Sequence, residues 1–284
     1  MEQFHPEKNR SPQEKLRGLV ADIAKEINGA AEWDYGMPGL VDAHGAIRME
    51  GFGGTSGFSD ERIEKDKKEI YEREVEWSGA RDEHIREFYA AQYGARTEED
   101  VVRIHRENKE KEKNGQMEMF VAALFHKMLK GDFIIARASA YDDYLHGIDT
   151  VMVNVKTGDV VCAFDEVHDH KASNRAAEKE EKIKKKARRG GSTLSYGIAM
   201  EEGRLVRKEI RNLPVFFLSL STSDLESALA YMNYGAAASA KEVELFAAFL
   251  ESLTRQREML LAEPVPAPVR ANLARFESSL KMMY

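Results

Sequence analysis

The chain has 284 residues, 43% of them hydrophobic, which is enough for one large domain or two small ones. Its formal net charge of −7 argues against a protein that coats nucleic acid, although a local basic patch is compatible with it. The single cysteine, Cys162, excludes an intrachain disulfide framework and favours a reducing cytoplasmic setting. The first ten residues lack the apolar core of a signal peptide, and no apolar run approaches the roughly 20 residues that span a membrane.

The amino-terminal third is predicted to be helical. Residues 1–10 are polar and predict a disordered tail. A helix then runs from Ser11 to about Trp33, with Pro12 at its first position and Glu14 completing a capping box. Three more charged helices are expected in region 11–115, with starts near Asp60, Asp82 and Thr97 and a break at Asn114 and Gly115. We interpret the first of these as a solvated helix with surface ion pairs.

From residue 116 the sequence becomes more apolar and predicts a core domain over 116–221. Residues 116–129 form a buried helix in which Glu118 is the one charge of the first half. Glu118 either interacts favourably with the helix dipole or belongs to a site. A strand follows over 133–139, and a turn over 142–147 leads to the next strand.

Residues 147–170 predict a β-hairpin, because both arms are rich in β-branched residues. A three-residue loop over 156–158, closed by Gly158 in the left-handed region, places Asp149 opposite Asp165. Their Cβ atoms would then lie roughly 5 Å apart on one face of the hairpin. Two adjacent carboxylates above an apolar face predict a counter-ion, and hard oxygen ligands suit Mg²⁺ or Mn²⁺. The alternative is that both acids lie at solvated strand ends and pair with Arg137 or a lysine.

The hairpin is followed by a strongly basic helix. Residues 171–189 hold nine Lys and Arg side chains against three Glu, in an acidic protein. This local excess of positive charge predicts contacts with nucleic-acid phosphates, through Lys182, Lys185, Lys186, Arg188 and Arg189.

Two further strands are expected at 194–200 and 213–220, and the second is apolar enough to be a buried central strand. Region 222–284 is predicted to be helical, with helices from Thr222 or Ser223, over 241–261 and over 269–282, and a stiff proline linker at 264–268. The fold class is therefore mixed α/β: a central four- to five-stranded mixed sheet flanked by helices, with helical terminal regions.

The order of elements over residues 116–220 is helix, three strands, helix and strand, and it resembles the core of the PD-(D/E)XK nuclease superfamily. In that resemblance Asp149 matches the first acidic residue and Asp165 opens the (D/E)-x-K motif. Glu118 matches the glutamate that the first core helix often contributes. The resemblance implies a metal-dependent nuclease acting on DNA or RNA, with Mg²⁺ or Mn²⁺ held by Glu118, Asp149 and Asp165.

The sequence departs from the family at Val167, which stands where the family has its lysine. Some members supply this lysine from the following helix, where Lys171, Lys179 and Lys182 are candidates. On a helical wheel Lys179 lies closest to the apolar stripe of Ala176 and Ile183, so its head could reach the site.

Two other functions fit the same residues. A member of this fold that has lost catalysis would bind nucleic acid or protein, and its exposed helices could also pair two copies of the chain. Alternatively, zinc or iron could bind the residues of a histidine-containing set, namely Asp165, His168, Asp169 and His170, with His126 and His146 as further donors.

Overall fold

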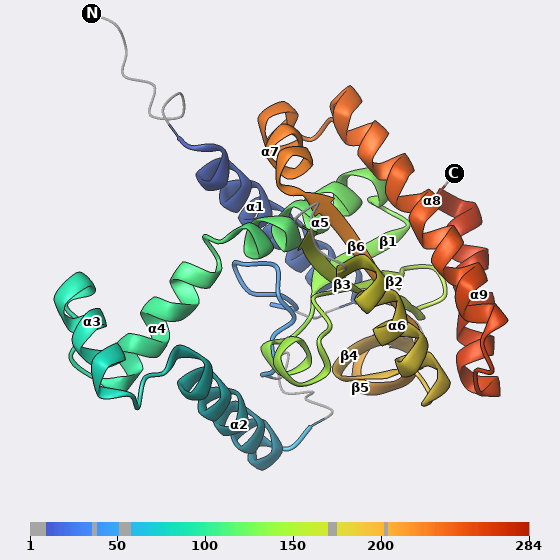
Figure 1. Ribbon diagram of the computed structural model, residues 1–284. Helices are drawn as coiled ribbons and strands as arrows, with labels where there is room; N and C mark the ends of the chain where they lie inside the picture. The colour runs from blue at the N-terminus through green and yellow to red at the C-terminus, as the bar shows by residue number, and fades with distance from the viewer. Residues whose placement is uncertain (1–9, 36–38, 51–57, 170–174, 202–203, 284) are drawn as a thin grey trace, which may run out of the picture.

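The computed structural model describes residues 10–35, 39–50, 58–169, 175–201 and 204–283. Its centre is a mixed four-stranded sheet in the order β1-β2-β3-β6 (Figure 1). The strands are β1 (Phe133–Arg137), β2 (Thr150–Asn154), β3 (Val160–Asp169) and β6 (Val215–Ser221). β2 pairs antiparallel with β1 and β3, whereas β6 runs parallel to β3. The predicted mixed α/β class is confirmed.

Helices pack around this sheet because each presents an apolar stripe to it. They are α1 (Pro12–Tyr35), α5 (Lys113–Leu129), α6 (Arg175–Arg188), α7 (Thr222–Tyr231), α8 (Ala240–Ala262) and α9 (Ala267–Met283). The Phe125 ring of α5 lies 5.2 Å from the Phe164 ring of β3 and 5.2 Å from the Phe246 ring of α8. These contacts hold the acidic end of the hairpin beside α5. No described helix is both long and apolar enough to cross a membrane.

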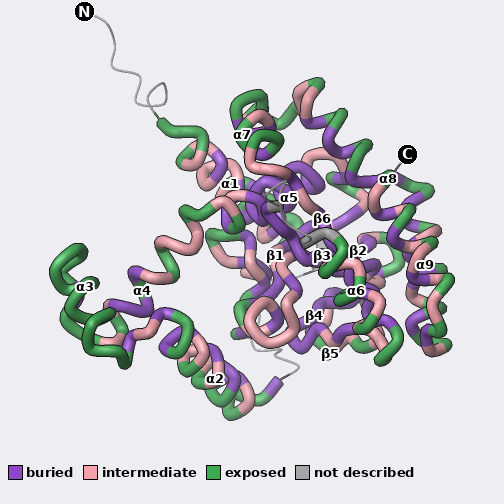
Figure 2. Tube along the Cα trace, in the orientation of Figure 1, coloured by how far each residue is buried: buried purple, intermediate pink, exposed green. Residues whose placement is uncertain are grey.

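Three helices form an arm that extends away from the sheet (Figure 1): α2 (Asp60–Ser78), α3 (Glu83–Tyr93) and α4 (Glu98–Lys109). The arm has a small apolar core of its own, which includes Val75, Val101 and Ile104. None of the residues of α3 is buried, in contrast to β3 and β6 (Figure 2).

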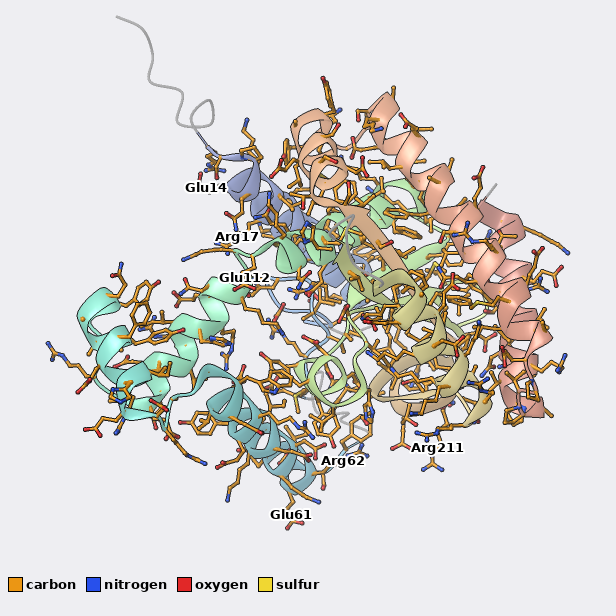
Figure 3. All side chains as sticks on the ribbon, viewed as in Figure 1. Glu14, Arg17, Glu61, Arg62, Glu112 and Arg211 are labelled. Atoms are coloured by element: carbon orange, nitrogen blue, oxygen red, sulfur yellow. The ribbon has the colours of Figure 1, made fainter. Side chains whose placement is uncertain are left out.

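Polar contacts attach α2 to the core. The Tyr196 hydroxyl of β4 (Ser192–Glu201) donates to Asp66 Oδ2 at 2.8 Å. Glu209 of β5 (Arg204–Leu213) lies 3.7 Å from Arg62 and 2.5 Å from Arg211. Figure 3 labels Arg62 and Arg211 where α2 approaches the core. α2 has the expected surface ion pairs, such as Lys67 with Glu64, but it also buries Asp66 and Glu74.

The predicted helix starts are confirmed by their caps. Ser59, Asp82 and Thr97 each accept a hydrogen bond from a backbone N–H in the first turn of the following helix. The predicted break at Asn114 and Gly115 is wrong, since α4 ends at Lys109 and both residues lie inside α5. A Cβ at Gly115 would lie 2.8 Å from the Glu110 Cα, so this glycine permits a close approach between the ends of two helices.

Four predictions about the second half need correction. β6 lies at the edge of the sheet and is not central, although α6, α7 and α8 contact it and keep it buried. β5 was missed, because its charged sequence, RLVRKEIRNL, has little apolar alternation. It pairs with β4 as a hairpin inserted between α6 and β6.

Ser221 caps α7, and α9 begins at Ala267, so the linker is shorter than predicted. Apart from Arg10, the predicted tail lies outside the described residues.

Candidate active site

The hairpin forms where it was predicted, but its loop differs from the prediction. The Asn154 N–H donates to the Asp159 carbonyl and Val153 pairs with Val160, so the loop is one residue longer than the predicted loop over 156–158. Gly158 has the predicted left-handed conformation, with φ of 70°. A shift of one residue between Met152 and Val153 restores the predicted pairing of Thr150 with Phe164, where the ladder ends. Asp149 does not pair with Asp165 in this ladder; it bonds to the backbone on both sides of Asp165, at the Phe164 carbonyl and the Glu166 N–H.

Asp149 extends the ladder beyond the end of β2 with its side chain. Its Oδ2 accepts the backbone N–H of Glu166 at 2.6 Å, in place of a strand carbonyl. Burial raises the pKa of Asp149 well above its ordinary value, and the carboxylates of Glu166 and Glu118 raise it further. Asp149 is thus held rigidly among other acids.

Glu166 is the acidic residue that the sequence reasoning missed. It is only 5% exposed, and neither of its carboxylate oxygens meets hydrogen-bond geometry with a partner among the described residues. Burial and the negative Glu118 raise the pKa of Glu166 to about 8, and nearby Thr150 and Asp149 offset part of this rise. The adjacent pair Asp165 and Glu166 was the available signal, but alternation along a strand sends the two side chains to opposite faces. Either one could therefore have been the acid beside Asp149.

Glu118 approaches this cluster from α5. Its Oε2 lies 2.6 Å from Arg137 Nη2. Arg137, which the sequence offered as a partner for the hairpin aspartates, therefore pairs with Glu118 instead. Glu118 also lines a cavity of about 740 Å³ between the arm and the core, as does Asp143. Burial is the main cause that raises the pKa of Asp143, to about 6.

Two lysines of α6 contact Asp165 on β3. Lys179 Nζ lies 2.5 Å from Asp165 Oδ1, and Lys182 Nζ lies 3.2 Å from Oδ2. The Asp165 side chain is 9% exposed and the Lys179 side chain 23%. Lys179, which the helical wheel selected, thus contacts Asp165 on β3. Val167, which stands in place of the family's lysine, is buried on the same strand.

The other basic residues have different environments. Lys186 donates to the His146 carbonyl at 2.6 Å, and burial, followed by the positive Lys182, lowers its pKa to about 8. Arg188 lies 3.0 Å from Glu263, while Lys185 and Arg189 are exposed. Lys171 lies outside the described residues.

The structure keeps the histidine candidates apart. His168 Nε2 lies 2.8 Å from Thr222 Oγ1, His126 lies 3.5 Å from Glu26, and His146 lies 3.2 Å from Ser195. His170 and the side chain of Asp169 are outside the described part of the chain. Across the described ranges, no group of three or more His, Cys, Asp and Glu side chains is arranged to hold a metal. In this arrangement Lys179, Lys182 and Arg137 are the counter-ions of the acids.

The chemistry of the acids nevertheless fits a divalent cation. Glu166 offers two buried oxygens without a hydrogen-bond partner among the described residues. Glu118 lies close enough to raise the pKa values of both Glu166 and Asp149. Such oxygen donors suit a hard cation. Comparisons with protein-family models, with curated proteins and with solved structures found no match for this chain.

Proposed function

We propose that this protein is a metal-dependent nuclease of the PD-(D/E)XK type, which hydrolyses phosphodiester bonds of DNA or RNA. One observation carries the proposal: Lys179 reaches from α6 to 2.5 Å from Asp165, and so supplies the cation that β3 lacks at Val167. The chain order α5, β1, β2, β3, α6, β6, with β4 and β5 inserted, is the order that the resemblance requires.

The acids that would hold Mg²⁺ or Mn²⁺ are Asp149, Glu166 and Glu118, with Asp165 available once Lys179 moves. When bound, the cation activates water and neutralises charge on the phosphate. Lys179 and Lys182 hold positive charge beside Asp165, where a phosphate oxygen would gain charge. Burial lowers the pKa of Lys186 to about 8, so Lys186 is suited to donate a proton to the leaving oxygen. The exposed Lys185 and Arg189 are candidates to contact the nucleic-acid backbone.

A second function, a binding module without catalysis, is favoured by a different observation. Two of the four acids already have counter-ions, Glu118 in Arg137 and Asp165 in Lys179 and Lys182. A scaffold that had lost its metal would keep such pairs. Thermal unfolding would then be the same in EDTA and in Mg²⁺, because an ion that does not bind cannot stabilise the folded state.

Cleavage of single- and double-stranded oligonucleotides in EDTA, Mg²⁺ and Mn²⁺ tests the proposal. Wild type should cleave only with metal, and Asp149→Asn, Glu166→Gln and Lys179→Met should each lose about 100-fold or more in rate. Glu178→Gln, an exposed glutamate of α6, is the matched control and should cleave like wild type. Full activity in Asp149→Asn, or cleavage in EDTA, would refute the proposed site. Absence of both cleavage and metal stabilisation in wild type would favour the binding module.

A further inference from the structure

An aromatic pair, with one ring exposed and the other half-buried, lies at the junction of the arm and the core. Trp77, near the end of α2, is 50% exposed, although large hydrophobic side chains are usually buried. Its ring stacks on Tyr144, with centroids 5.0 Å apart and planes at 21°. Two segments that are distant in sequence thus build one aromatic surface.

The Tyr144 ring is held in place by the hydrogen bond of its hydroxyl. Its hydroxyl donates to Glu74 Oε1 at 2.9 Å, and Arg106 of α4 holds the same carboxylate with two bonds of 2.8 and 2.5 Å. Glu74 is only 4% exposed, so its carboxylate is shielded from water, whereas the Arg106 side chain is 55% exposed. A ring that is already immobile loses little conformational entropy when a ligand stacks on the pair.

A lysine accompanies the aromatic pair. Lys109 Nζ lies 4.8 Å from the centroid of Tyr144 and 5.7 Å from that of Trp77. No ion pair joins Lys109 to a carboxylate of the described residues, so its charge is available to a phosphate. An aromatic platform beside a cation is the combination that binds a nucleobase together with its backbone phosphate.

The pair is continuous with the candidate active site. Tyr144 directly follows Asp143, and both line the cavity of about 740 Å³. Lys109 and Glu118 line the same cavity, and Lys109 is the positive charge that most lowers the pKa of Asp143. A chain stacked on Trp77 would pass over Tyr144 into this cavity, where Glu118 is the proposed metal ligand among the lining residues.

We propose that Trp77, Tyr144 and Lys109 bind an unpaired nucleobase and its phosphate, so that the substrate of this protein is a single-stranded nucleic acid. This inference rests on the proposed nuclease function and specifies its substrate class. A base within a duplex has both faces covered by its neighbours, and it can stack on a side chain only after it leaves the duplex.

The two tryptophans, Trp33 and Trp77, make the test direct. In Trp33→Phe the remaining fluorescence reports on Trp77. A 12-nucleotide single strand, added in EDTA so that metal-dependent cleavage is absent, should quench it with saturation, and the matching duplex should bind at least about 10-fold more weakly. Measured by anisotropy of a labelled strand, Trp77→Ala should weaken binding by about 5- to 150-fold, as expected for one lost base–aromatic stack. Trp77→Phe should retain most of the affinity.

Trp33→Ala is the matched control, because Trp33 is 90% exposed on α1, and it should bind like wild type. Lys109→Gln should weaken binding and reduce its salt dependence by about one phosphate contact. Any one of four results would overturn the inference. They are unchanged Trp77 fluorescence when the strand is bound, equal affinity for the duplex, wild-type affinity of Trp77→Ala for the strand, and no binding of the strand at all. If the strand stacks on Trp77 but is not cleaved in any metal, the single-strand site is supported and the nuclease function is refuted. If wild type and Trp77→Ala cleave single strands equally in the presence of metal, the nuclease function is supported and the single-strand site is refuted.

Discussion

At the scale of single residues, the acids of the hairpin differ in how they are neutralised. Asp165 is paired with two lysines, whereas Glu166, its neighbour in sequence, is buried without a cation of its own. A buried carboxyl without a partner keeps its proton, because the charged form is poorly solvated. Glu166 is therefore the residue whose protonation depends most directly on the fold.

Replacing Glu166 with Gln should change how stability depends on pH. The pKa of Glu166 rises from its ordinary 4.5 to about 8 on folding. Between these values the folded state binds the proton and the unfolded state releases it, so the free energy of unfolding falls as pH rises. Glu166→Gln removes this loss and should be more stable than wild type at pH 8 by on the order of 4 kcal/mol, but not at pH 4.5.

Urea unfolding in EDTA at pH 4.5, 6, 7 and 8 measures this effect. Glu178→Gln, whose side chain is exposed, should follow the wild-type curve. Parallel curves for wild type and Glu166→Gln would show that Glu166 keeps an ordinary pKa in the folded state.

At the scale of elements, a side chain of α8 forms hydrogen bonds with the free edge of strand β6. Gln256 of α8 accepts from the Phe217 N–H at 2.9 Å and donates to the Phe217 carbonyl at 2.8 Å. An open strand edge presents unpaired backbone groups, and here one buried amide satisfies a donor and an acceptor. The apolar sequence of β6 indicated that both faces are covered, but it carried no information about the number of neighbouring strands.

Gln256→Leu should lower the free energy of unfolding by about 2 to 5 kcal/mol, because two buried backbone groups lose their partners at about 1 to 3 kcal/mol each. The matched control is Arg255→Leu, an exposed change one residue away that should stay within about 0.5 kcal/mol of wild type. Chemical denaturation measures both. Equal midpoints for the two variants would show that Gln256 contributes nothing to closing the sheet.

At the scale of the whole molecule, the chain has a large core around the sheet and a smaller one in the arm. The arm is attached through polar and aromatic contacts, among them Glu74 with Tyr144 and Asp66 with Tyr196. A third apolar cluster also joins it to the core, with Ile63 and Ile70 of α2 against Tyr196 of β4. Because the cavity lies between arm and core, these contacts also set its width.

Native-state hydrogen exchange should rank the elements accordingly. Amides of β2 and β3 should exchange only on global unfolding, since their side chains are buried. Amides of α3, which has no buried residue, should exchange fastest among the described helices. Protection of α3 equal to that of β3 would contradict this order and would indicate that something covers the arm.

The sequence by itself determined the features that depend on neighbours along the chain. The helix starts near Asp60, Asp82 and Thr97 and the positive φ of Gly158 follow from local backbone and side-chain chemistry. The pairing near the acids does not, because it depends on the register shift between Met152 and Val153. The helical wheel also found Lys179, because one helix and one strand meet over a short connection.

The tertiary structure decided everything that joins distant segments. Asn114 and Gly115 read as a break, but the nearby end of α4 makes that glycine a packing residue within α5. Three further features depend on how α2, α5 and the hairpin approach one another. They are the burial of Glu166, the ion pair of Arg137 with Glu118, and the stack of Trp77 on Tyr144. Burial and pairing are set by atoms that lie close in space but far apart in sequence, and residue pattern alone carries no record of them.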